Sequence, residues 1–261
     1  MHIHLINLDR SSERLAEFCN VNRHLTSVSR FAAIEGSALN PDDLARRGLI
    51  TKDILARDFF TPGALGCAVS HLALWDRAIA NNRTVTISED DAIFNQHFEL
   101  RAEEVLKTLP ADWDLIYWGF NFDLFLCFDM LHGVSPCVAT FNQEQMRAAV
   151  AAFQKQSTAP RAFRVIWAFG ALCYSISPKG AQVIKSKILP LRPKIFQLPE
   201  AKGVPPYSPA WRMVGIDNCI NTVHREISSY VCFPPLVVSK NEAPTSMTRN
   251  SAPEPNSPSN G

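Results

Sequence analysis

The sequence contains no long hydrophobic run, no paired-cysteine motif and almost no net charge. No stretch approaches the roughly 20 apolar residues that a helix needs to span a bilayer, so we expect no membrane-spanning segment. The 26 basic and 25 acidic residues nearly cancel, which excludes the broad basic surface of a dedicated nucleic-acid-binding protein. No basic amphipathic stretch is present either, so any contact with a membrane should be peripheral.

The cysteines indicate a reducing compartment. There are seven of them, an odd total, scattered along the chain without C-x-x-C spacing. This pattern excludes a disulfide framework or a zinc finger, and it is typical of reduced thiols buried as small hydrophobic residues. The strand-like segment 2–8 follows neither a basic leader nor an apolar segment of signal-peptide length. We therefore expect a cytoplasmic protein.

Short apolar segments alternate with amphipathic ones, and the 46% hydrophobic content can supply a substantial core. Strands are predicted at residues 2–8, 28–34, 84–88, 113–119 and 171–177, with an edge strand near 229–233. Helices are predicted to open at Ser11 or Ser12, at 61–79, 99–109 and 142–156, from 178, and at 216–226. This alternation favours an α/β fold whose sheet has at least a parallel core.

Three segments have a composition unlike that of regular elements. Residues 120–141 are aromatic-rich and irregular, as in a hairpin or an excursion over the sheet. Prolines are frequent at 190–209, which predicts a loop that could cover an active site. Pro, Ser, Asn and Thr dominate residues 241–261, which predicts a disordered tail. Since no linker or repeat precedes this tail, residues 1–240 are predicted to form a single domain.

Three consecutive carboxylates, Glu89, Asp90 and Asp91, end the β-branched run at 84–88. Adjacent like charges repel one another, and a bound divalent cation is a common way to relieve that repulsion. Strand alternation would place Glu89 and Asp91 on one side of the backbone and Asp90 on the other. The alternative is a solvated acidic turn at a strand end.

Other charged residues follow predicted strands in the same way. Arg10 and Arg14 come after the first strand, and Asp123 comes after another. In open α/β sheets, ligands collect beyond the carboxyl ends of the strands. Basic side chains beside an acidic metal site suggest an anionic, metal-bound ligand such as a diphosphate. Either arginine alone would indicate no more than a solvated helix face.

Several segments closely resemble glycosyltransferase family 25. The strongest are INLDRSSERL at 6–15, GALGCAVSHLALW at 63–75 and ISEDD at 87–91. Residues 171–181, 215–218 and 234–238 also resemble the family pattern, so the resemblance covers about residues 2–240. The family includes bacterial lipooligosaccharide galactosyltransferases and related domains of animal collagen galactosyltransferases.

The resemblance implies a GT-A-like fold, a Rossmann-like mixed sheet with flanking helices. It implies an inverting transfer, typically of galactose from UDP-galactose, to a hydroxyl of a glycan acceptor, with Mn²⁺ or Mg²⁺ as cofactor. Together with the expected compartment, it favours a bacterial enzyme that extends a lipid-linked saccharide, such as lipooligosaccharide, at the cytosolic face of the inner membrane.

The resemblance places the acidic triplet at the family's DxD-type metal and donor motif. Asp91 is the first choice for holding the cation, and Glu89 is shared between the cation and the ribose of the donor. A lone histidine in an apolar helix, such as His71, is otherwise a structural residue. The strand ends and the resemblance together predict a donor site of Asn7, Arg10, Arg14, Ser70, His71, Glu89 and Asp90.

An inverting displacement also needs a general base for the acceptor hydroxyl. Asp217 is the first choice, because it lies in a neutral stretch that opens a late helix; the alternative is N-terminal helix capping. Asp114 and Asp123 are rival bases. His224, two turns further on, is either a further metal ligand or an exposed helix residue.

Two other classes of protein could use the same residues. A metal-dependent phosphoesterase would need further His or Asp ligands for a two-metal site, and the seven histidines form no obvious cluster in the sequence. A catalytically silent module that binds sugar nucleotides or glycans would carry the same motifs.

Overall fold

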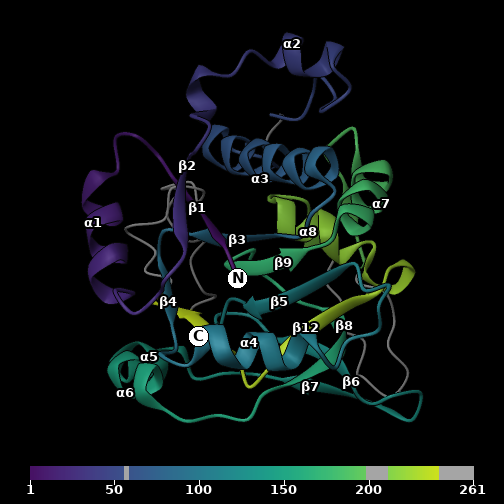
Figure 1. Cartoon of the computed structure of the whole chain (residues 1–261). Helices are drawn as coiled ribbons and strands as arrows, with labels where there is room; N and C mark the ends of the chain where they lie inside the picture. The colour runs from purple at the N-terminus through teal and green to yellow at the C-terminus, as the bar shows by residue number, and fades with distance from the viewer. Residues whose placement is uncertain (56–58, 198–210, 241–261) are drawn as a thin grey trace, which may run out of the picture.

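The computed structural model describes residues 1–55, 59–197 and 211–240, and a large mixed sheet organises them (Figure 1). The strands are β1 (Ile3–Asn7), β2 (Val28–Ala32), β3 (Val85–Glu89), β4 (Ala92–Phe94), β5 (Leu115–Gly119), β6 (Leu126–Leu131), β7 (Ser135–Ala139), β8 (Arg161–Trp167), β9 (Cys173–Ile176), β10 (Ile195–Phe196), β11 (Trp211–Arg212), β12 (Ser229–Phe233) and β13 (Val237–Ser239).

Helices flank the sheet. They are α1 (Ser12–Val21), η1 (Gly36–Ala38), α2 (Pro41–Arg46), α3 (Pro62–Asn81), α4 (Phe98–Leu106), α5 (Gln143–Ala148), α6 (Val150–Lys155), α7 (Pro178–Ile188), α8 (Ile216–Asn221) and η2 (His224–Glu226). The longest, α3, begins where its sequence dictates, because the Thr61 hydroxyl accepts the N–H of Ala64 at 3.0 Å and Pro62 fills the first turn.

The main sheet mixes parallel and antiparallel pairs. Its order is β2-β1-β3-β9-β5-β12-β8-β6-β7, and β13 adds to β5 and β4. The pairs β2-β1, β1-β3 and β5-β12 are parallel, whereas β9 runs antiparallel between β3 and β5. The predicted GT-A-like, Rossmann-like mixed sheet with flanking helices is confirmed.

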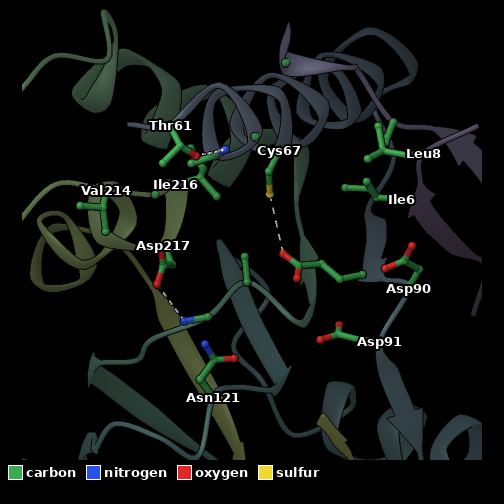
Figure 2. A pocket seen from close by; sticks show the side chains of 18 of the residues that line it. Ile6, Leu8, Thr61, Cys67, Asp90, Asp91, Asn121, Val214, Ile216 and Asp217 are labelled. Carbon is green, nitrogen blue, oxygen red and sulfur yellow. Dashed lines mark hydrogen bonds between the residues drawn. The ribbon is translucent and has the colours of Figure 1, made fainter. Parts of the chain in front are cut away.

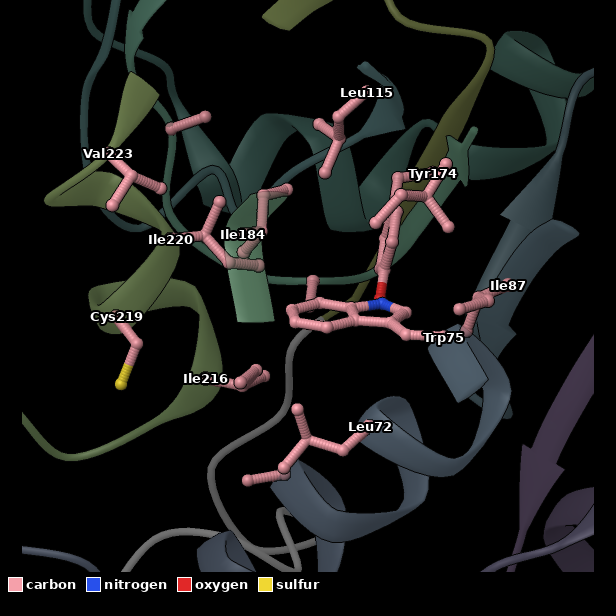
Figure 3. Close-up of a cluster of buried hydrophobic side chains, with 14 of the residues drawn as sticks. Leu72, Trp75, Ile87, Leu115, Tyr174, Ile184, Ile216, Cys219, Ile220 and Val223 are labelled. Atoms are coloured by element: carbon pink, nitrogen blue, oxygen red, sulfur yellow. The ribbon is translucent and has the colours of Figure 1, made fainter. Parts of the chain in front are cut away.

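Each face of the sheet packs a separate hydrophobic core. In Figure 1, α3 lies above β3 and β9, whereas α4 lies below β5. The first core contains Trp75 of α3, and the second contains Phe98 of α4. Neighbouring strand residues divide between them as strand alternation requires, since Leu115 belongs to the first core and Ile116 to the second. Trp75 of α3, fully buried, stands at the centre of the first core (Figure 3). Phe98 and Trp118 contribute to the second core, with their rings edge to face at 6.0 Å.

Two glycines set the position of α3. A Cβ at Gly66 would lie 2.5 Å from the carbonyl oxygen of Ile34 and 2.6 Å from the nitrogen of Gly36. A Cβ at Gly36 would lie 1.7 Å from the carbonyl oxygen of Pro62. The backbone of α3 therefore directly contacts the backbone of the segment that follows β2, and this close contact holds the first turns of the helix beside η1.

Several predicted elements need correction. The predicted edge strand at 229–233 is β12, which lies inside the sheet between β5 and β8. Strands β8 and β13 were not predicted. The predicted helix at 142–156 is two short helices, and the one at 216–226 ends at Asn221 before a separate turn of 3₁₀ helix.

Part of the predicted proline-rich loop and the whole predicted tail lie outside the described residues. Of residues 190–209, only 190–197 are described, and there β10 pairs antiparallel with β11. The tail at 241–261 is outside the described ranges, and the division into one domain and a tail remains a prediction.

Within the described ranges, every helix is too short or too polar to cross a membrane.

Candidate active site

A cavity of about 670 Å³ opens where the neighbouring parallel strands β1 and β3 end, with Ile6 in register with Glu89. Ligand sites in α/β sheets collect at this edge. The walls also include the first turns of α1, α3 and α8 and the segments that follow β5 and precede β9. Figure 2 shows Asp90 and Asp91 on one side of this space and Asp217 on the other.

Asp90 is held firmly in place. Its Oδ1 accepts a hydrogen bond from Nε of Arg14 at 2.9 Å and forms an ion pair with the same guanidinium. The amide Nδ2 of Asn7 donates to Oδ2 of Asp90 at 2.8 Å and to the main-chain oxygen of Ser11 at 3.0 Å. Nε of Arg30 donates to the amide oxygen of Asn7 at 2.9 Å. Both amide hydrogens of Asn7 are thus engaged, which fixes the orientation of its side chain. Asn7 and Arg14 line the cavity, and both orient Asp90.

Asp91 has one satisfied and one unsatisfied oxygen. Its Oδ2 accepts the hydroxyl of Ser239, on β13, at 2.8 Å, whereas its buried Oδ1 has no hydrogen-bond partner among the described residues. Burial raises the pKa of Asp91 to about 6, and the nearby charge of Glu89 adds to the effect. A buried oxygen without a partner beside a second carboxylate suits a divalent cation.

Glu89 faces α3. Its Oε1 accepts a weak hydrogen bond from Sγ of Cys67 at 3.8 Å, drawn in Figure 2, and lies 3.6 Å from Nε2 of His71. Nδ1 of His71 is 2.8 Å from the hydroxyl oxygen of Tyr174, which also accepts Nε1 of Trp75 at 2.7 Å. Glu89 therefore connects the cavity to a buried polar network.

The prediction that strand alternation separates the three carboxylates is wrong. The strand ends at Glu89, and the next two residues form the turn into β4. All three carboxylates line the same cavity. Glu89 faces α3, Asp90 faces α1 and Asp91 faces β13. The three carboxylates therefore differ in their bonding partners and not in the side of a strand on which they lie.

Asp217 lies in the first turn of α8, across the cavity from the acidic triplet (Figure 2). Its Oδ2 accepts the main-chain N–H of Gly170 at 2.9 Å. Burial raises the pKa of Asp217, the charge of Glu89 adds to the rise, and the bond from Gly170 opposes it. Gly170 has a φ of +80°, and a Cβ there would overlap the side chain of Asn121.

Two further predicted residues lie at the cavity. Arg10 lines it and forms an ion pair with Glu35, another lining residue. Asp123, a rival to Asp217 as general base, also lines it. The cavity thus brings acidic groups together with Arg10 and Arg14, as the strand-end argument predicted, and Arg212 lines it as well.

Ser70 and His71 do not line the cavity, and both are fully buried. The Ser70 hydroxyl donates to the carbonyl of Gly66 at 2.8 Å and accepts the N–H of Ile34 at 2.8 Å. The predicted place of both residues beside the donor is therefore corrected to a place behind the cavity wall, where Ser70 ties α3 to the segment after β2.

Asp114 and His224 lie elsewhere. Asp114 is buried, accepts the N–H of Ser228 at 2.8 Å and pairs with Lys179 at 3.0 Å. His224 is also buried, with Nδ1 3.1 Å from the hydroxyl of Ser229, and so it is neither an exposed helix residue nor at the predicted metal site. The helix that would have carried it toward the cavity ends earlier in the chain. Neither residue lines the cavity.

Cys67, Asn121 and Trp211 are among the lining residues that the sequence analysis missed. Cys67 precedes His71 by one helical turn on α3, a spacing that could have been recognised. Asn121 follows the end of β5 and would have met the strand-end criterion. Trp211 is brought in by packing against Phe169, at a centroid distance of 5.0 Å, which the sequence does not signal.

A family model described as "Glycosyltransferase family 25 (LPS biosynthesis protein)" matches residues 1–192. The chain belongs to glycosyltransferase family 25. A "Glycosyltransferase 25 family member" of Aedes aegypti is 34% identical over 126 residues, which are 45% of this chain and 21% of that protein. "Procollagen galactosyltransferase 1" of Danio rerio is 26% identical over 126 residues, with the same shares.

The human "Inactive glycosyltransferase 25 family member 3" is 30% identical over 95 residues, which are 33% of this chain and 16% of that protein. The matches therefore span only 16% to 21% of the length of these three relatives. The family match includes the acidic triplet, α1 and α3, whereas Asp217 lies beyond its last residue. The case for Asp217 in this family member rests on its position at the cavity.

Proposed function

We propose that this family member is an inverting glycosyltransferase that moves a sugar, galactose as the first candidate, from a UDP-sugar to a hydroxyl of a glycan acceptor. One observation carries the proposal: Asp91, with its unpartnered buried oxygen, lies across a strand-end cavity from Asp217. A donor diphosphate near Asp91 would leave the opposite wall for the acceptor.

The residues present fit a divalent cation, Mn²⁺ or Mg²⁺. Asp91 would hold it through Oδ1, and Glu89 is the second carboxylate of the site. When bound, the cation would offset the negative charge that develops on the leaving diphosphate. Asn7 and Arg14 fix Asp90 beside this position, and Arg10 adds positive charge at the rim for the phosphates.

Asp217 is the proposed general base. Single displacement requires a base on the side of the sugar away from the leaving group. The raised pKa of Asp217 favours its taking a proton from the acceptor hydroxyl, and the Gly170 N–H holds the carboxylate in position. Asn121 and Trp211 line the same cavity, and an amide beside an aromatic ring suits a sugar hydroxyl and a sugar face.

The acceptor we propose is a lipid-linked saccharide such as bacterial lipooligosaccharide. The family description names LPS biosynthesis, and the matched Danio rerio relative is named for procollagen. A cytoplasmic enzyme with peripheral contact at the inner face of the inner membrane fits this acceptor.

Thermal unfolding with UDP tests the donor site. UDP should raise the melting temperature, and Mn²⁺ should increase that rise, since a ligand that binds only the folded state stabilises it. Asp91→Asn should remove the increment due to Mn²⁺ and leave the fold intact. Asp42→Asn, on the exposed surface of α2, is the matched control and should keep the increment. A UDP shift indifferent to Mn²⁺ in the unsubstituted protein would count against the proposal.

A silent binding module remains the second candidate, because the human relative is named inactive. Incubation with a panel of UDP-sugars and Mn²⁺ separates the two. A transferase should hydrolyse its donor slowly without an acceptor, whereas a silent module would bind UDP and release no sugar. The phosphoesterase alternative has less support, because the described residues offer just one group of three His, Cys, Asp or Glu side chains able to hold a metal.

A further inference from the structure

Behind the acidic triplet lies a cluster of a different chemical character. Sγ of Cys67, Nε2 of His71 and Oε1 of Glu89 all lie within 4.8 Å of one another. Cys67 and His71 are one turn apart on α3, and Glu89 ends the strand that packs beneath that helix. A thiol, an imidazole and a carboxylate form a ligand set typical of Zn²⁺, whereas Mn²⁺ and Mg²⁺ prefer oxygen ligands alone.

The buried imidazole points to a ligand. His71 has no exposed surface, and its Nε2 has no hydrogen-bond partner among the described residues. Its other nitrogen, Nδ1, is 2.8 Å from the Tyr174 hydroxyl, whose oxygen can accept from both His71 and Trp75. In the tautomer that a metal would select, Nδ1–H donates to the Tyr174 oxygen and Nε2 presents its lone pair to the cluster. Histidines that bind metals are fixed through their second nitrogen in this way.

The spacing is close to that of a tetrahedral zinc site. With Zn–S, Zn–N and Zn–O bonds of about 2.3, 2.0 and 2.1 Å, ligand atoms are about 3.4–3.6 Å apart. Oε1 of Glu89 lies 3.8 Å from Sγ of Cys67 and 3.6 Å from Nε2 of His71. The third pair, Sγ of Cys67 and Nε2 of His71, is no more than 4.8 Å apart.

We propose that Cys67, His71 and Glu89 form a binding site for a thiophilic divalent cation of the Zn²⁺ class, separate from the site proposed at Asp91. Cys67 and Glu89 line the cavity, so the fourth coordination position faces it. The cation displaces the thiol proton and binds the thiolate. Because Glu89 belongs to both proposed sites, a cation bound here would leave Glu89 unavailable to the cation at Asp91.

Cobalt titration of the full chain tests this site. Co²⁺ should bind at one equivalent with a near-ultraviolet thiolate-to-metal band, and Zn²⁺ should abolish the band by displacement. Cys67→Ser should lose the band, and His71→Gln should weaken binding at least about tenfold. Cys19→Ser, at an exposed cysteine of α1, is the matched control and should keep the band. Absence of the band, or its survival in Cys67→Ser, overturns the proposal.

A second measurement uses the unsubstituted protein, and so it tests the site even if these variants fail to fold. Zn²⁺ should slow iodoacetamide modification of Cys67 at least about tenfold, since a metal-bound thiolate is not free to attack. Modification of Cys19 should be unchanged, and equal rates at Cys67 with and without Zn²⁺ overturn the site. The UDP and Mn²⁺ melting experiment does not depend on Cys67 or His71, whereas the cobalt band and the protection from iodoacetamide require Cys67, so the two proposals fail separately.

Discussion

At the scale of single residues, three adjacent carboxylates differ because their partners differ. Asp90 is neutralised by Arg14 and oriented by Asn7, whereas Asp91 keeps a buried oxygen without a described partner. A buried carboxylate oxygen without a partner is well placed to bind a cation. Glu89 lies between this proposed site and the thiol and imidazole of α3.

Asp217→Asn should lower kcat by at least about 100-fold, because an amide cannot accept the acceptor's proton. The affinity for UDP should change by less than about threefold, since the side chain keeps its size and its bond from Gly170. Steady-state kinetics and calorimetric titration with UDP measure the two quantities. Asp123→Asn, in the same cavity, is the matched comparison and should retain most turnover. A collapse of UDP affinity in Asp217→Asn would instead make Asp217 a nucleotide-binding residue.

His224 should control part of the acid sensitivity of the fold. Burial lowers the pKa of His224 from 6.5 to about 3, so between these values the unfolded chain binds the proton that the folded chain excludes. Its contribution to stability is therefore present above pH 6.5 and is lost as the pH falls toward 3, by at most about 1.4 kcal/mol per pH unit.

Urea unfolding across this pH range checks the prediction. His224→Gln should show a shallower loss of stability between pH 6.5 and 3 than the unsubstituted protein. His132→Gln, at an exposed histidine in the turn between β6 and β7, should keep the original slope. Parallel slopes for all three proteins would show that burial of His224 does not penalise its charged form.

At the scale of elements, the site depends on how closely α3 approaches η1. An alanine in place of a mid-helix glycine ordinarily stabilises a helix by about 1 kcal/mol. Gly66→Ala should instead destabilise the protein by about 2–3 kcal/mol, because its Cβ would meet the backbone of Ile34 and Gly36. Urea unfolding measures the change, and Ala80→Gly, at an exposed position of α3, measures the ordinary propensity effect. A gain of stability in Gly66→Ala would contradict the close contact.

Local signals predicted the elements that they control. Thr61 and Pro62 fixed the start of α3, and the β-branched residues before Glu89 fixed β3. Local signals did not reveal β8, β12 as an inner strand, or β13, because their places depend on pairing with distant strands. The position of the cavity was likewise predicted from the ends of the strands. The contact of Asp217 with Gly170 was not, because it depends on a loop conformation that no sequence spacing encodes.

At the scale of the whole molecule, the two cores share their strands and should unfold together. Leu115 and Ile116 are adjacent and fully buried but belong to opposite cores. Each substitution by alanine should lower the free energy of unfolding by about 2–5 kcal/mol. In both variants, tryptophan fluorescence and far-ultraviolet circular dichroism should give one coincident urea transition. Two separated transitions in either variant would show that the cores fold independently.

The hydrogen bond between Ser239 and Asp91 joins β13, the last strand of the described residues, to the turn between β3 and β4. These residues are 148 positions apart in the chain. A ribosome that has released the family-matched segment, residues 1–192, has therefore not yet supplied Ser239. During synthesis the acidic triplet emerges early, but Asp91 acquires its final surroundings only when β13 joins the sheet, so a nascent chain carries the motif before it carries the finished site.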